Sequence, residues 1–198
     1  MTFYHANKEK IDWIFDQHRQ TNHLYDSYLP YEFHLKLTIQ IGQEYKWLLQ
    51  KEYCKDDNIS VSHLEHTIFP RIELGLAGHD LIENTNVSYN TTIQKLGCIP
   101  ADMIFALADE KGKTRKERHN DKYYHGILDT EHALYGKLCD RIANCRYSLF
   151  TMNNDKLRMY KHEHLEFMAK LKYSNDHKYE PMFAEISDIL FTKFKETK

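Results

Sequence analysis

Apolar residues recur along most of this sequence at the three- and four-residue spacing of amphipathic helices, and no stretch alternates convincingly with a period of two. Ile11, Ile14 and Phe15 mark the apolar face of a first helix. His18 falls on the same face, where a core histidine with a satisfied hydrogen bond is expected. Residues 21–29 are polar and aromatic without helical spacing, so they are predicted to form a loop. The whole pattern predicts an all-α fold.

Further helices follow from the same spacing. Pro30 is predicted to open the second helix, because proline suits a first helical turn, and this helix should end near Cys54. Residues 55–58 and 109–122 are rich in charge and are predicted to be a solvated turn and a solvated loop. The remaining helices are predicted over residues 72–82, 91–96, 100–107, 131–150, 157–171 and 181–194.

Composition narrows the class of protein. The 198 residues are enough for one domain with a substantial core. Lys and Arg number 27 against 29 Asp and Glu, which argues against a general nucleic-acid binder and against an anionic-membrane binder. No run of 18 apolar residues predicts a transmembrane helix, and residues 1–5 do not resemble a signal peptide. The four cysteines lack CxxC spacing, and Cys139 and Cys145 are expected to be small core side chains. A cytoplasmic location is therefore expected.

The pair His79-Asp80 is the first candidate for chemistry. Its imidazole nitrogen and carboxylate oxygen suit a borderline or hard divalent cation such as Mn, Fe or Zn. Glu83 follows one helical turn after His79 and should share its face. A polar helix end before the loop at residues 84–90 is the alternative interpretation of this segment.

Other polar side chains are weaker candidates. His63 and His66 could share a metal, but no third ligand is placed nearby, so an ordinary helical face is favoured. Asp140 and Asn144 lie one turn apart beside the apolar stripe of their helix. A carboxylate in that place must be paired, hydrogen-bonded or metal-bound. The charged segment could fringe a phosphate site through Lys111, Arg115 and Arg118.

Four short strings carry a resemblance to a known family. PYEFH, which ends at His34, looks like the motif PYxxH, and HDLIENT, from His79, looks like HDxxEDT. KLCDRIAN, which contains Asp140, is close to KLADRxxN, and TIQKLG is a loose match to IxxxFG. The order H…HD…D resembles the HD-domain metal-dependent phosphohydrolases. Within them, the chain is most similar to RelA/SpoT-type (p)ppGpp hydrolases, including the small single-domain members.

The resemblance implies a single HD domain over residues 1–198, a helical bundle with a metal site in its centre. The family-like core would cover about residues 10–150, with the helices of residues 151–198 packing on it. Manganese is the expected ion, and Fe, Zn and Mg are also compatible. The implied metal ligands are His34, His79, Asp80 and Asp140.

The implied activity is that of a guanosine 3′,5′-bis(diphosphate) 3′-pyrophosphohydrolase, with Glu83 as general base and Asn84 orienting water. Asn144 would contact the sugar or phosphate of the nucleotide. The full set of implied substrate-binding residues is Lys111, Arg115, Arg118, Lys137, Arg141 and Asn144.

Three departures from the family pattern keep a second hypothesis open. Asn84 stands where the family has Asp, and Asn22, His23 and Leu24 stand where it has a basic residue. The longer spacing between His34 and His79 implies an insertion at residues 51–70, expected to lie outside the metal site. The alternative is therefore a slow or inactive HD module that senses a nucleotide or binds a partner. The sequence assigns no oligomeric state.

Overall fold

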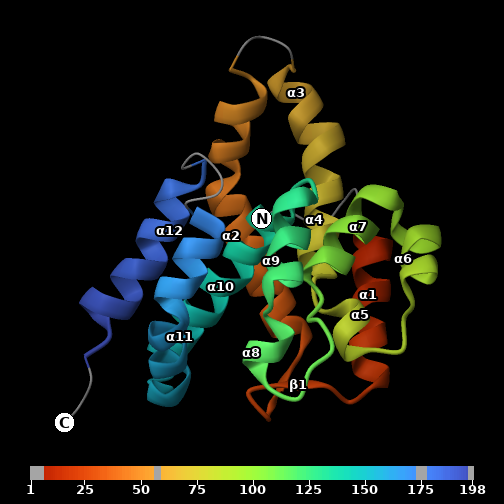
Figure 1. The fold of residues 1–198 in the computed structure, drawn as a ribbon. Coiled ribbons are helices and arrows are strands. Elements are labelled where there is room, and N and C mark those ends of the chain that lie inside the picture. Colours follow the sequence, from red (N-terminus) through yellow and green to blue (C-terminus); the bar gives the residue numbers. More distant parts are fainter. Residues whose placement is uncertain (1–6, 56–58, 173–177, 196–198) are drawn as a thin grey trace.

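The computed structural model describes residues 7–55, 59–172 and 178–195, and the fold of these residues is all-α, as predicted (Figure 1). From the N-terminus come α1 (Lys8–Gln20), the short antiparallel strands β1 (Leu24–Tyr25) and β2 (Leu29–Pro30), α2 (Glu32–Tyr53) and α3 (Val61–His63). A π-helical segment, η1 (Leu64–Ile68), leads into α4 (Phe69–Ala77). The next elements are α5 (Leu81–Asn84), α6 (Tyr89–Leu96), α7 (Cys98–Leu107), α8 (Arg115–Arg118), α9 (Asp121–Asp129) and α10 (Ala133–Phe150). The described part ends with α11 (Asn154–Phe167), η2 (Met168–Lys172), α12 (Glu180–Ser187) and η3 (Asp188–Lys193).

The buried helix α10 organises the core. It packs along α2 and also contacts α4, α7, α9, α11 and α12. Its buried side chains include Leu138, Cys139, Ile142 and Cys145, so the prediction that both cysteines are core residues is confirmed. The apolar face of α1, with Ile11 and Ile14 fully buried, joins the same core. Through this packing α2, α4 and α10 hold the segments that carry the candidate metal ligands.

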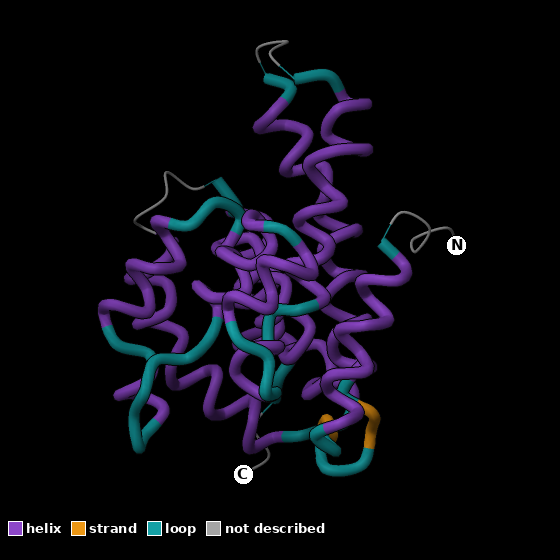
Figure 2. The backbone as a smooth tube through the Cα atoms, turned by 90° about the vertical axis from the view of Figure 1, so that its right-hand side faces the viewer, coloured by secondary structure: helices purple, strands orange, loops and turns teal. Residues whose placement is uncertain are grey.

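The predicted insertion lies far from those ligands. The C-terminal half of α2 runs beside α3 and η1, and these three segments together project from the rest of the helices (Figures 1 and 2). His66 Nδ1 donates a hydrogen bond to the Ser62 carbonyl oxygen at 3.0 Å, and His63 ends α3. The predicted turn at residues 56–58 falls outside the described residues. The described part of the insertion is helical at residues 51–53 and 61–70 and forms a turn or bend at residues 54, 55 and 59.

Several predicted boundaries are wrong for local reasons. Pro30 belongs to β2, and α2 begins at Glu32. The loop predicted at residues 21–29 contains β1 and the first residue of β2, which pair in a small hairpin (Figure 2). The helix predicted over residues 72–82 ends at Ala77 and resumes at Leu81, so the His-Asp pair lies in a turn. Within the segment 109–122, Thr114 and Glu117 form a capping box that begins α8.

The buried His18 also differs from expectation. It is 1 % exposed, and neither ring nitrogen has a hydrogen-bond partner among the described residues. Instead its ring stacks on Tyr31, with centroids 4.9 Å apart. Burial lowers the pKa of His18 to about 4, so the ring is neutral at physiological pH.

Among the residues that the structure describes, no helix combines the length and the apolar character needed to cross a bilayer.

Gly42 is a packing constraint at the junction of α2 and α4. A Cβ atom there would lie 2.3 Å from Leu76 Cδ1, so the leucine side chain would have to move within the core. Gly42→Ala should therefore destabilise the protein by about 1–3 kcal/mol in urea unfolding. The matched control is Gly126→Ala in α9, where a Cβ meets nothing within 4 Å, and which should be neutral or stabilising. A Gly42→Ala protein as stable as wild type would contradict this assignment.

Candidate metal centre

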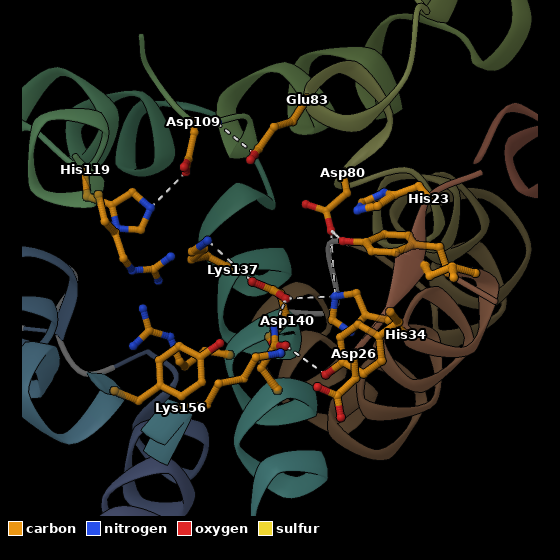
Figure 3. A pocket seen from close by; sticks show the side chains of 17 residues that line it. His23, Asp26, His34, Asp80, Glu83, Asp109, His119, Lys137, Asp140 and Lys156 are labelled. Atoms are coloured by element: carbon orange, nitrogen blue, oxygen red, sulfur yellow. Dashed lines mark hydrogen bonds and ion pairs between the residues drawn. The ribbon is translucent and has the colours of Figure 1, made fainter. Parts of the chain in front are cut away.

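Four polar side chains converge from three segments of the chain, and Figure 3 shows three of them, His34, Asp80 and Asp140. His34 lies in the first turn of α2, and Asp140 lies near the middle of α10. His79 and Asp80 occupy the turn between α4 and α5. The sequence-predicted ligand set is therefore brought together, although the role of these residues as ligands stays a prediction.

The donor atoms face one another at short range. His34 Nε2 lies 3.1 Å from His79 Nε2 and 3.2 Å from Asp140 Oδ1. Asp80 Oδ2 lies 3.2 Å from His79 Nε2 and 3.8 Å from His34 Nε2. His34, His79 and Asp140 form the one group of three or more potential ligands found among residues 7–55, 59–172 and 178–195. Both histidines are almost fully buried, at 2 % and 3 % exposed.

The hydrogen bonds of His79 show that this cluster fits a divalent cation. Its Nδ1 lies 2.8 Å from the Leu76 carbonyl oxygen, which can only accept, so Nδ1 carries the proton. In the neutral ring, Nε2 then presents a lone pair to His34 and to two carboxylates. Lone pairs that face one another at this range repel unless a proton or a cation lies between them. Two imidazole nitrogens with carboxylate oxygens are a ligand set that suits Mn, Fe or Zn.

The pKa shifts in the cluster also favour a bound cation. Burial lowers the pKa of His79, but Asp80 and Asp140 outweigh it and raise that pKa well above its usual value. Burial raises the pKa of Asp140, but Lys137, His34 and His79 hold it well below the usual range. The two carboxylates are thus ionised and attract a positive charge to the point that they share.

Gly78 allows the turn between α4 and α5 that carries His79 and Asp80. A Cβ there would lie 2.6 Å from Ile104 Cδ1 and 3.3 Å from the Leu74 carbonyl oxygen. Without a side chain, the end of α4 packs closely on α7, and the chain turns to direct His79 inward. This close approach places His79 where a continuous helix would not.

Three members of the cluster, His34, Asp80 and Asp140, line a pocket of about 280 Å³. Glu83 lines the same pocket, and its Oε2 accepts a hydrogen bond from the Asp109 backbone N–H at 3.2 Å (Figure 3). Glu83 reaches solvent, but protein surrounds part of its carboxyl group. Burial, followed by the negative charges of Asp80 and Asp109, raises the pKa of Glu83. Asp109 itself bonds His119 and Arg118, and its pKa falls to about 2.

The predicted substrate residues divide into two groups. Arg115, Lys137, Arg141 and Asn144 line the pocket. Lys111 is exposed and does not line it, and Arg118 is outside the lining with its Nε 2.8 Å from Asp109 Oδ2.

Asn84, predicted to orient water, lies outside the pocket lining. Its Nδ2 donates to the Tyr31 hydroxyl oxygen at 3.4 Å.

Sequence reasoning missed several lining residues. Lys156 comes from α11, which no motif connects to the cluster, and Tyr25 comes from a segment without periodicity. Tyr31 lies inside the PYEFH string and could have been singled out there. The full set of missed lining residues is His23, Leu24, Tyr25, Asp26, Tyr31, Asp109, His119, Lys156 and Tyr160.

Comparisons with known proteins support the fold. No family model matches the sequence, and no curated protein matches it. A solved structure does match, from work describing a metazoan ortholog of SpoT that hydrolyses ppGpp and plays a role in starvation responses. The two are 16% identical, with a TM-score of 0.59, and the match covers 96% of each chain. That structure is a helical HD-domain hydrolase. The chain has the HD-domain fold. In this HD fold the cluster and Glu83 come from the same strings that suggested the resemblance.

Proposed function

We propose that this protein is a metal-dependent nucleotide phosphohydrolase that acts in the cytoplasm on guanosine 3′,5′-bis(diphosphate) or a closely related nucleotide. The observation that carries the proposal is the convergence of His34, His79, Asp80 and Asp140 on one point, beside Glu83 in the same pocket. The HD-domain fold, seen in a hydrolase that acts on ppGpp, supports the same reaction class.

The four clustered side chains would hold the divalent ion, with Mn²⁺ as the expected metal. When bound, such an ion lowers the pKa of a water molecule and polarises a phosphoryl oxygen. The buried histidines and the ionised carboxylates supply a fixed set of ligands that needs little rearrangement.

Glu83 would accept the proton of the attacking water. Its raised pKa brings the carboxylate closer to the proton affinity that a base needs near neutral pH, and the Asp109 N–H fixes its orientation. Asn84 cannot take a proton at neutral pH, so Glu83 alone carries this step.

Four cationic side chains line the pocket and would bind the phosphates: Lys137, Lys156, Arg115 and Arg141. Lys137 is largely buried. Glu163 holds both arginines, with its Oε1 2.6 Å from Arg115 Nε and its Oε2 3.5 Å from Arg141 NH2. Asn144 lines the pocket, where the proposal assigns it a sugar or phosphate contact.

A nucleotide panel tests this function. The purified chain, with Mn²⁺ added, should release pyrophosphate from guanosine 3′,5′-bis(diphosphate) and not from GTP. Chelation by EDTA should abolish the release. Absence of phosphate or pyrophosphate release from every nucleotide, with Mn²⁺ shown to be bound, would contradict the proposal.

The alternative, an HD module that senses a nucleotide, has one observation in its favour. The amide of Asn84 is bonded to Tyr31, where the family pattern has a second carboxylate beside Glu83. That module would bind the guanosine nucleotide in calorimetry without turning it over.

Arg115 and Lys111 allow a direct test of phosphate binding, since only Arg115 lines the pocket. Arg115→Ala should raise KM by roughly tenfold, the equivalent of about 1.4 kcal/mol, because one charged contact to phosphate is lost. Lys111→Ala is the matched control and should leave KM unchanged. Equal effects of the two substitutions in steady-state kinetics would contradict the placement of the phosphates.

A further inference from the structure

The hairpin segment, residues 24–31, brings two tyrosines to the two carboxylates of the metal centre. Tyr25 lies in β1, and Tyr31 directly precedes α2. Tyr25 is 5 % exposed, and both phenols line the pocket. Both hydroxyl groups are hydrogen-bond donors, Tyr25 to Asn144 and Tyr31 to Asp80.

Tyr25 reaches Asp140 through Asn144. The Tyr25 hydroxyl donates to Asn144 Oδ1 at 3.0 Å. This bond fixes the direction of the amide, so Asn144 Nδ2 donates to Asp140 Oδ1 at 2.5 Å. Asp140 Oδ1 is also the oxygen that lies 3.2 Å from His34 Nε2. The Tyr25 ring stacks on His34, with centroids 4.7 Å apart and planes 8° apart. Tyr25 therefore contacts one candidate ligand and orients another.

Tyr31 acts on the other carboxylate directly. Its hydroxyl donates to Asp80 Oδ2, the oxygen that faces His79. Asn84 Nδ2 donates to the Tyr31 oxygen, so the phenol proton remains available to Asp80. An aspartate at position 84 would instead present an acceptor and compete for that proton. The amide at this position is therefore compatible with the bond from Tyr31 to Asp80.

Stacking and hydrogen bonds restrain both tyrosines. The Tyr31 ring stacks on the rings of both His18 and His23, at centroid distances of 4.9 and 3.8 Å. The hairpin is also tied to α10, because Tyr147 donates to Asp26 Oδ2 at 3.1 Å. These contacts leave the two hydroxyl groups little freedom.

We propose that Tyr25 and Tyr31 are positioning residues of the metal centre, which hold Asp140 and Asp80 with their oxygens directed at the point shared by the two histidines. The inference rests on the proposed function, because it requires that the cluster binds a metal ion. Outer hydrogen-bond partners of metal ligands typically contribute about 10–100-fold to metal affinity.

Titration of the full-length chain with Mn²⁺ alone, by calorimetry, tests this role. Tyr25→Phe keeps the ring stacked on His34 and removes only the hydroxyl, and Tyr31→Phe does the same for Asp80. Each variant should bind Mn²⁺ about 10–100-fold more weakly than wild type. The matched control is Tyr28→Phe, from the same hairpin, whose hydroxyl contacts Tyr147 and not the cluster. Its affinity should be unchanged.

A double-mutant cycle separates positioning from a general loss of structure. Asn144→Ala breaks the Tyr25 relay at its other end, so the double variant Tyr25→Phe/Asn144→Ala should bind Mn²⁺ no more weakly than Asn144→Ala alone. Fully additive losses would overturn the relay. Thermal unfolding of the metal-free variants is the last measurement. Lower stability with unchanged Mn²⁺ affinity would show that the tyrosines have a merely structural role.

The outcomes distinguish this inference from the function on which it rests. A wild-type chain that binds no Mn²⁺ would overturn both. Wild type, Tyr25→Phe and Tyr31→Phe binding Mn²⁺ equally well would overturn the inference and leave the proposed function standing.

Discussion

Replacing Glu83 by glutamine should lower turnover by about 10²-fold or more while Mn²⁺ affinity stays the same. The substitution keeps the size of the side chain and its ability to accept the Asp109 N–H bond. It removes only the group that can take a proton from water. Single-turnover release of pyrophosphate, measured at saturating Mn²⁺, reports this step.

The control for Glu83→Gln is the same substitution at Glu65. Glu65 lies on η1, where it pairs with Lys46 at 2.7 Å, outside the pocket lining. Glu65→Gln should be fully active. If Glu83→Gln retained wild-type turnover, another residue would be the base. If it lost Mn²⁺ as well, Glu83 would have to be reassigned as a support of the metal centre.

The helices were predictable because their apolar faces are long and regular. The stripe Leu138, Ile142 and Cys145 placed α10 correctly, and with it the inward direction of Asp140. The break at Gly78 was not predictable from that pattern. Residues on both sides of it are buried, so the apolar spacing continues through the turn although the helix does not.

The side chains that surround the candidate metal ligands were not predictable from the sequence pattern. Two-residue strands are too short for an alternating pattern, so the segment holding Tyr25 was expected to be a loop. Its position depends on contacts with α10 from more than a hundred residues later, such as the bond from Tyr25 to Asn144. Likewise, His18 was expected to find a hydrogen bond, yet stacking on Tyr31 occupies its ring face instead.

In the charged segment, residues 109–122, the sequence could not show which cations line the pocket. Spacing alone treated Lys111, Arg115 and Arg118 as equivalent, since all three lie in one charge run. The capping box at Thr114 starts a short helix that directs Arg115 to Glu163 and the pocket. Arg118, one turn later, bonds Asp109 instead. Tertiary partners thus decide which of these cations lines the pocket.

Asp140→Ala should weaken Mn²⁺ binding by more than the roughly 10–100-fold expected for the outer tyrosines, because it removes one of the proposed ligands itself. Asp140 Oδ1 approaches both histidine Nε2 atoms, at 3.2 and 3.6 Å. Its loss also leaves the largely buried Lys137 ammonium, 3.4 Å from Asp140 Oδ2, without this partner, which adds positive charge beside the vacated position.

The kinetic signature should differ from that of Glu83→Gln. Raising the Mn²⁺ concentration should restore part of the turnover of Asp140→Ala, since the base remains in place, whereas no concentration should rescue Glu83→Gln. Asp155→Ala, at an exposed carboxylate in the first turn of α11, is the control and should match wild type at every Mn²⁺ concentration. Mn²⁺ binding by Asp140→Ala as tight as that of wild type would remove Asp140 from the ligand set, and the shared point between His34 and His79 would then need another anion to hold the ion.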